Sequence, residues 1–135
     1  TYSVSEKFFV NRALYKVSSP KRGDVIVFKT SASDSAALHI RRVIGLPGET
    51  VQVKDGKIYI NGKVYEENGA YQDMTDGGLA NSAITLESGE YFVLGDNRNN
   101  SEDSRFSDIG NISKKYIVGK VWFTVSPKNK IGFIK

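Results

Sequence analysis

The sequence has no cysteine, one histidine, three prolines and no long apolar run among its 135 residues. The absence of cysteine excludes disulfides, thiol catalysis and cysteine zinc sites, and a single histidine leaves little room for a histidine-rich metal site. No segment approaches the ~20 apolar residues that a membrane helix needs. A chain of this length buries enough surface to fold without a metal or a disulfide. We therefore expect a single domain, residues 1–135, that needs no metal or organic cofactor.

Positive charge is in only slight excess, because 19 Lys and Arg against 15 Asp and Glu give a net charge of +4. A nucleic-acid-binding surface requires clustered basic residues interleaved with exposed aromatic side chains. Here the basic residues are spread along the chain, and the densest charged segment, residues 96–105, has mixed sign. We predict no nucleic-acid partner and interpret the charge as a solvated surface that keeps the protein soluble. Attraction to an anionic membrane face stays open as an alternative.

Short runs of apolar and β-branched residues dominate the chain, which is typical of β-strands. Asp55-Gly56 and Asn61-Gly62 are turn pairs that favour two successive hairpins. No helical period extends over more than about one turn, and the best candidate is residues 113–116. We predict strands at residues 25–28, 38–44, 51–53, 57–60, 63–65, 91–94, 117–125 and 131–134. The predicted fold class is all-β, a barrel or a coiled pair of antiparallel sheets with very little helix.

Two features concern the organisation of the chain. Residues 66–88 are polar and rich in glycine, and we interpret them as an excursion or insertion between strands. The chain starts at Thr1 without a methionine and enters a strand-like run almost at once. We therefore expect it to be a trimmed part of a longer protein.

Two segments combine polar groups with fixed spacing. The first joins residues 22–28 (Arg-Gly-Asp-Val-Ile-Val-Phe) to residues 39–49 (His-Ile-Arg-Arg-Val-Ile-Gly-Leu-Pro-Gly-Glu). The second is residues 95–105 (Gly-Asp-Asn-Arg-Asn-Asn-Ser-Glu-Asp-Ser-Arg). Taken alone, the second segment is typical of a polar loop whose side chains cap backbone N–H groups.

Several side chains of the second segment could still carry chemistry. Asp103 could form a buried ion pair with Arg98 or with Arg105, and the residues alone leave this open. Ser101 and Ser104 offer hydroxyl groups.

In this order, the two segments resemble the type I signal peptidases. Members of that family show Gly-Asp, three apolar residues and Phe, then Lys-Arg, two apolar residues and Gly-Leu-Pro-Gly-Asp. A third motif follows, Gly-Asp-Asn-Arg-x-x-Ser-x-Asp-Ser-Arg, and residues 95–105 match it at every fixed position. The resemblance covers about residue 22 to the C-terminus. The short excursion is similar to that of Gram-positive members.

The resemblance implies a membrane-anchored serine protease that removes signal peptides from exported proteins on the outer side of the membrane. It implies a single-pass anchor and a nucleophilic serine segment, both upstream of Thr1. Its partners would be signal peptides or other extended peptides of exported proteins. The family uses a Ser–Lys dyad, in which burial lowers the pKa of the lysine so that a neutral amine acts as general base.

The family's site positions can be carried over by counting along the motifs. Arg41 stands where the family has the lysine base, so this position departs from the pattern. Ser101 stands where the family has the serine that orients the base. The positions that brace the site in the family are Asp96, Arg42, Asp103 and Arg105.

Arg41 cannot serve as the general base, because a guanidinium is effectively never deprotonated in a protein. The family's Ser-Met nucleophile pair is also absent, since the only methionine is Met74. His39 lies two residues before Arg41 and, by strand alternation, on the same face, about 6–7 Å along the strand. We weigh it as a substitute base against an ordinary strand histidine, and favour the ordinary one.

Three functions follow in order of preference. The first is a signal-peptidase-like protein without hydrolytic activity. Some degenerate members of the family assist the assembly of surface structures such as pili. A retained groove could hold an extended peptide by strand addition. The second is an active signal peptidase with an unconventional base. The third is a β-rich binding module that only mimics the motifs.

Adjacent aromatic residues offer one more candidate surface. Neighbouring strand residues face opposite sides, so Phe8 and Phe9 can hardly both be core residues. The resemblance implies that they form a rim that contacts membrane or substrate. Trp122 and Phe123 are interpreted as core aromatics of a small β domain.

Overall fold

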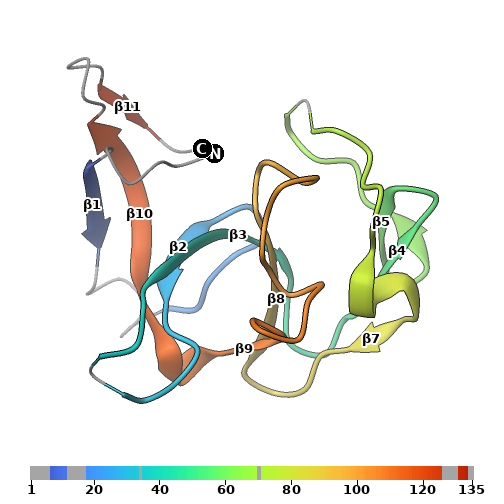
Figure 1. Cartoon of the computed structure of the whole chain (residues 1–135), viewed down its shortest axis with the longest axis horizontal. Helices are drawn as coiled ribbons and strands as arrows, with labels where there is room; N and C mark the ends of the chain where they lie inside the picture. The colour runs from blue at the N-terminus through green and yellow to red at the C-terminus, as the bar shows by residue number, and fades with distance from the viewer. Residues whose placement is uncertain (1–6, 12–17, 34, 70, 126–130, 134–135) are drawn as a thin grey trace.

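The computed structural model of the chain describes residues 7–11, 18–33, 35–69, 71–125 and 131–133, and the side chains of 7–11, 122–125 and 131–133 are not described. Two antiparallel sheets make up the fold, and the only helices among these residues are two short 3₁₀ turns. This confirms the all-β prediction (Figure 1). The strands are β1 Lys7–Asn11, β2 Val25–Phe28, β3 His39–Gly45, β4 Thr50–Lys54, β5 Lys57–Ile60, β6 Lys63–Val64, β7 Ile84–Thr85, β8 Glu90–Leu94, β9 Ile112–Ser113, β10 Ile117–Val125 and β11 Ile131–Phe133. The 3₁₀ turns are η1 Gly78–Asn81 and η2 Lys114–Tyr116.

The larger, seven-stranded sheet has the order β1-β10-β2-β3-β8-β9, with β11 also paired to β10. All four residues of β2 and the last four of β8 are buried. Continuous burial explains why these two strands are apolar without alternation, since both faces of each strand are covered. On one face, Ile26 and Phe28 of β2 pack with Val93 of β8. β3 lies between these strands and so is held on both sides over part of its length.

The smaller sheet has the order β6-β5-β4-β7. Asp55 and Asn61 have φ of 53°, and the glycines that follow them, Gly56 and Gly62, have φ of 79° and 82°. Two consecutive residues with positive φ are what a type I′ hairpin turn requires. Both predicted hairpins are therefore present, and their turns set the register of β4, β5 and β6.

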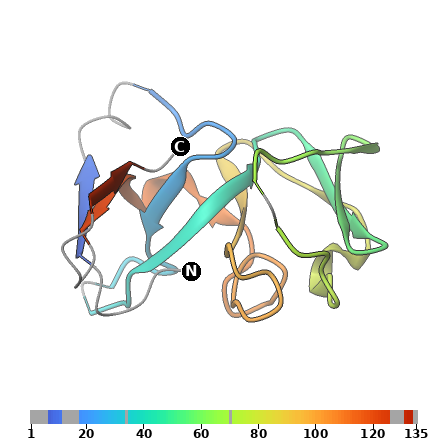
Figure 2. The same ribbon diagram turned by 90° about the horizontal axis from the view of Figure 1, so that it is seen from above.

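One hydrophobic cluster joins the two sheets. Ile44 of β3 and Phe92 and Leu94 of β8 pack against Val51 of β4 and Ile58 of β5. Figure 2 shows the smaller sheet beside the end of the larger one, with β3 running into it. The polar loop of residues 95–105 leaves β8 close to this junction (Figure 1).

Residues 66–88 are more firmly anchored than their polar composition indicates. Met74, Ala80 and Leu86 are buried in the cluster that joins the sheets. The segment also forms η1 and β7, and β7 extends the smaller sheet by pairing with β4. The segment therefore contributes to the core as well as to the surface.

The predicted strands agree with the structure to within about one residue, and the short turn expected at residues 113–116 is η2. The two-residue strands β7 and β9 were not predicted, because two residues carry no periodicity. Phe8 and Phe9 lie in β1, which pairs with β10, but their side chains, like those of Trp122 and Phe123, lie outside the described residues. No helix within the described part of the chain is long and apolar enough to cross a membrane.

Candidate functional site

The register of β3 places its arginines on opposite faces. His39 and Arg41 pair with Phe28 and Ile26 of β2, so all four lie on one face of the sheet. Arg42 pairs with Val25 on one side and with Leu94 on the other, and lies on the opposite face. Strand alternation therefore separates the two neighbouring arginines into different surroundings.

Arg42 connects β3 to the start of the polar loop. Its Nε and Nη2 atoms donate to the two carboxylate oxygens of Asp96, each at 2.8 Å. Nη1 donates to the backbone carbonyl of Gly23, at 2.9 Å. Both side chains of the ion pair are only 12% exposed. A bidentate pair in this setting fixes direction as well as distance, so the loop is held at a defined angle to β3.

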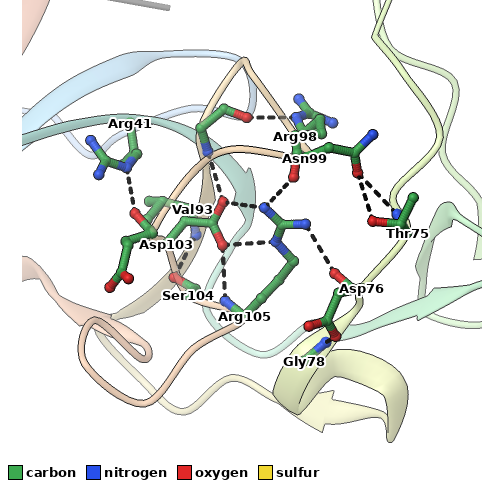
Figure 3. Close-up of polar contacts among 12 residues, drawn as sticks. Arg41, Thr75, Asp76, Gly78, Val93, Arg98, Asn99, Asp103, Ser104 and Arg105 are labelled. Carbon is green, nitrogen blue, oxygen red and sulfur yellow. Dashed lines mark hydrogen bonds and ion pairs between the residues drawn. The ribbon is translucent and has the colours of Figure 1, made fainter.

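Asp103 and Arg105 form a fully buried ion pair inside the loop, with side-chain exposures of 0% and 1%. The guanidinium donates Nε to one carboxylate oxygen and Nη2 to the other, both at 2.9 Å. The same carboxylate accepts the backbone N–H of Gly95, at 3.0 Å. The loop closes on β8 through a second pair of bonds, in which Ser104 exchanges N–H and hydroxyl contacts with Val93 (Figure 3). The buried carboxylate is therefore the centre of the loop.

The other arginine of the loop, Arg98, binds a different carboxylate. Its side chain is 1% exposed, donates Nε to the Gly95 carbonyl at 2.8 Å, and forms a bidentate pair with Glu67. The ring of Tyr71 lies 4.1 Å from the guanidinium. The choice that the sequence left open, Arg98 or Arg105 as the partner of Asp103, is thus decided in favour of Arg105. Glu67 was not predicted to belong to this cluster, because no motif marks it.

Arg41 lies on the other side of the same loop. Its Nε donates to the backbone carbonyl of Glu102 at 2.6 Å (Figure 3). Its Nη1 donates to the backbone carbonyl of Ile40 at 2.7 Å. A Cβ added to Gly95 would lie 2.5 Å from the Cβ of Ser101 and 3.6 Å from the Cδ of Arg41. The absence of a side chain at Gly95 is therefore what allows Ser101 to lie against the backbone beside Arg41.

The charge of Arg41 is retained despite its half-buried position. Burial lowers the pKa of Arg41, while the carboxylates of Asp103 and Glu102 raise it. A guanidinium remains protonated at any physiological pH even in such surroundings. The side chain can therefore donate hydrogen bonds and attract negative charge, but it cannot accept a proton.

His39 occupies the same face as Arg41, as strand alternation predicted. Its ring is stacked on Phe28, with the ring centroids 5.6 Å apart. Burial and, to a smaller degree, the charge of Arg41 lower the pKa of His39. The lowered pKa favours the neutral imidazole, which is the form that a general base requires.

Residues 1–126 match the protein family described as signal peptidase, peptidase S26. The chain belongs to this family. It is 38% identical over 138 residues to a signal peptidase I of Leptolyngbya laminosa, an alignment that covers 98% of this chain and 66% of that protein. A probable signal peptidase I of Synechocystis sp. is 31% identical over 143 residues, covering 99% of this chain and 61% of the relative.

The fold agrees with a solved member of the family. The crystal structure of a signal peptidase I from Enterococcus faecalis has 32% sequence identity and a TM-score of 0.58, and the match covers 77% of this chain and 97% of that one. The present chain therefore has the signal peptidase fold. It spans less than two thirds of the length of the two curated relatives named above.

The structure brings the site residues carried over from the signal peptidase motifs into one cluster. Arg41 and Ser101 both lie close to Gly95. The two bracing ion pairs, Arg42 with Asp96 and Arg105 with Asp103, hold the loop that contains Ser101. The catalytic roles of these residues stay predictions. Within the described residues, no group of three or more His, Asp or Glu side chains could hold a metal ion.

Proposed function

We propose that this chain is a signal-peptidase-like protein that binds extended segments of exported proteins and does not hydrolyse them by the Ser–Lys mechanism. The observation that carries the proposal is the position of Arg41. A permanently charged guanidinium, held by the carbonyls of Ile40 and Glu102, occupies the place where the family motif has its lysine base. The surrounding ion pairs are kept, which supports a retained binding function on an intact scaffold.

The clients of such a protein would be signal peptides or other extended peptides of exported proteins, pilins among them, at the outer face of the cell membrane. The names of the relatives support the peptide class, since both are signal peptidases I. The pilin client and the membrane location follow from the resemblance to degenerate family members. A role in pilus assembly predicts that deletion of the gene reduces polymerised pilin on the cell surface while secretion of other proteins continues.

The second candidate is an active signal peptidase with an unconventional base. The position and protonation state of His39 favour it, because a neutral imidazole lies on the same face as Arg41. This candidate predicts cleavage that survives Arg41→Gln and disappears in His39→Gln. It also predicts activity that falls as the pH drops through the lowered pKa of His39, because protonation removes the base.

One assay separates the two candidates. The full natural protein is incubated with a secretory preprotein and with a peptide containing an Ala-x-Ala sequence, and cleavage is followed by mass spectrometry. The proposal predicts saturable peptide binding without turnover. Cleavage at a rate ordinary for a signal peptidase would overturn it, and sensitivity to His39→Gln would then identify the base. Absence of both binding and cleavage would count against both candidates.

A further inference from the structure

The guanidinium of Arg41 differs from the other arginines that the structure describes. Each of those forms an ion pair with a carboxylate: Arg22, Arg42, Arg98 and Arg105. Arg41 meets backbone carbonyls only, through Nε and Nη1. Two carboxylates act on Arg41 electrostatically. That of Asp103 is already engaged by Arg105, and Glu102 bonds to Arg41 through its backbone carbonyl and not through an ion pair. Within the described residues, the charge of Arg41 is therefore the one arginine charge without a carboxylate partner.

The backbone of β3 beside Arg41 has hydrogen-bonding groups that point away from β2. Val43 donates its N–H to the carbonyl of Asp24 and accepts the N–H of Gly23, each at 2.8 Å, so the backbone polar groups of Val43 point to the β2 side of β3. Hydrogen-bonded and non-hydrogen-bonded pairs alternate in an antiparallel ladder. Ile40 and Val27 consequently form a non-hydrogen-bonded pair, and the N–H and C=O of Ile40 point away from β2.

No described strand occupies this second edge of β3 next to Ile40. The pairing of β3 with β8 begins only at Arg42 and continues toward Gly45. The Ile40 carbonyl accepts a hydrogen bond from Arg41 Nη1 instead of from a strand. A peptide that pairs with this edge would therefore run directly toward the guanidinium.

The second terminal nitrogen of Arg41, Nη2, is available at this position. Neither of the hydrogen bonds of Arg41 uses Nη2. A buried Nη2 would thus be a buried nitrogen without a partner, and the described residues contain no such side-chain atom. Nη2 is therefore accessible from outside. The fixed orientation of the guanidinium reduces the entropy that would be lost when an acceptor binds there.

We propose that Arg41 binds the free α-carboxylate of an extended peptide that pairs with the edge of β3 at Ile40. The chemistry is complementary, since a guanidinium in a half-buried site with no other carboxylate partner favours an anion with two oxygens. This inference rests on the proposed function and names its ligand class, a peptide that ends in a free carboxylate. An uncleaved polypeptide passing through the site would leave the charge of Arg41 without a partner.

The test compares three fluorescent hexapeptides, two with one sequence ending in Ala-x-Ala and a third in which aspartate replaces the last alanine. One ends in a free carboxylate, one in a carboxamide, and one in a carboxamide with aspartate as its last residue. Affinities for the full natural protein are measured by fluorescence anisotropy at low and high salt. The free-acid peptide is expected to bind about tenfold more tightly than its amide, and the difference should shrink in high salt.

Two variants and one control make the result specific. Arg41→Gln should abolish the preference for the free acid while leaving amide binding within about twofold, and Arg41→Lys should keep part of the preference. Lys54→Gln, which removes one positive charge from an exposed hairpin position, should leave the preference unchanged. The fold of each variant is checked by circular dichroism.

The outcomes distinguish the inference from the function on which it rests. Equal binding of acid and amide, with or without Arg41, would overturn the inference alone. Binding of the aspartate peptide as tight as that of the free acid would overturn the assignment to a chain terminus. No binding of any peptide would overturn the proposed function as well, whereas turnover of the amide peptide would overturn only the claim of a silent protease.

Discussion

At the scale of single residues, the ion pairs of this protein differ greatly in burial. The side chains of Asp103 and Arg105 are 0% and 1% exposed, whereas those of Lys57 and Asp73 are 56% and 66% exposed. Removing one partner of a buried pair leaves an uncompensated charge in a medium of low polarity, while an exposed charge is solvated by water. Two ion pairs with the same separation, 2.9 Å, should therefore contribute very differently to stability.

Replacing Asp103 by asparagine should lower the free energy of unfolding by about 3 kcal/mol or more. The substitution keeps the shape of the side chain but leaves the Arg105 charge buried without its partner, and it weakens the acceptor of the Gly95 N–H. Urea unfolding followed by tryptophan fluorescence measures the change.

The matched control for this prediction is Asp73→Asn, which breaks the exposed pair with Lys57. It should change the free energy of unfolding by about 0.5 kcal/mol or less. Losses of equal size in the two variants would show that burial does not govern these pairs.

At the scale of secondary-structure elements, residues 66–88 are tied to the polar loop by contacts at several points. Glu67 binds Arg98. Thr75 donates its N–H and hydroxyl to Asn99, and the Asp76 carbonyl accepts from Arg105 (Figure 3). The loop and the segment should therefore move together. The Thr75–Asn99 contact is exposed, whereas the other two contacts are partly buried, so we expect the loss of the Thr75–Asn99 contact to act locally.

Replacing Asn99 by alanine should speed amide exchange at Thr75 by about tenfold, because the exposed hydrogen bond from this amide to Asn99 Oδ1 is lost. Hydrogen exchange followed by NMR measures it residue by residue. The amide of Tyr65, which donates to the Ile58 carbonyl in the neighbouring hairpin, serves as internal control and should be unchanged. Equal acceleration at both amides would indicate global destabilisation and contradict the local coupling.

At the scale of the whole molecule, the two sheets are joined by a shared apolar core and by a polar contact at the β3–β4 turn. Glu49 in this turn forms a bidentate pair with Arg22, which precedes β2, and also accepts the N–H of Leu46. The hydrogen bonds from Arg22 lower the pKa of Glu49, with a further lowering from Leu46 and partial opposition from burial. The contact thus links the turn that leads into the smaller sheet to the larger one.

The pH dependence of stability follows from the direction of this change in pKa. A carboxyl with a lower pKa in the folded state stabilises the fold above its unfolded pKa, and the contribution is lost as the pH falls through the folded-state pKa. Glu49→Gln should therefore cost about 1–2 kcal/mol at pH 7, and the difference from the natural protein should vanish in acid.

Urea unfolding of both proteins at a series of pH values measures this difference. The control is Glu66→Gln, which neutralises an exposed glutamate and should leave the pH profile nearly unchanged. A difference between the natural protein and Glu49→Gln that stays constant from pH 7 into acid would contradict the assignment to the Glu49 carboxylate.

The sequence by itself determined the strands, the hairpin turns and the chemical nature of the unusual site residue. Apolar runs such as residues 25–28 carry a local signal for strands, and the Asp-Gly and Asn-Gly pairs for turns, because these preferences act within a few residues. The permanent charge of Arg41 is a property of the guanidinium and needs no structure to establish it.

Only the tertiary structure decided which charges meet. Arg98 binds Glu67, 31 residues away in the sequence, and Arg105 binds Asp103 within the same loop, although composition allowed either arginine to bind Asp103. Likewise, three apolar residues anchor the polar segment 66–88 in the core. Such contacts depend on how strands and loops are brought together in space. A period-two sequence pattern does not tell which residues that are far apart in the sequence come into contact.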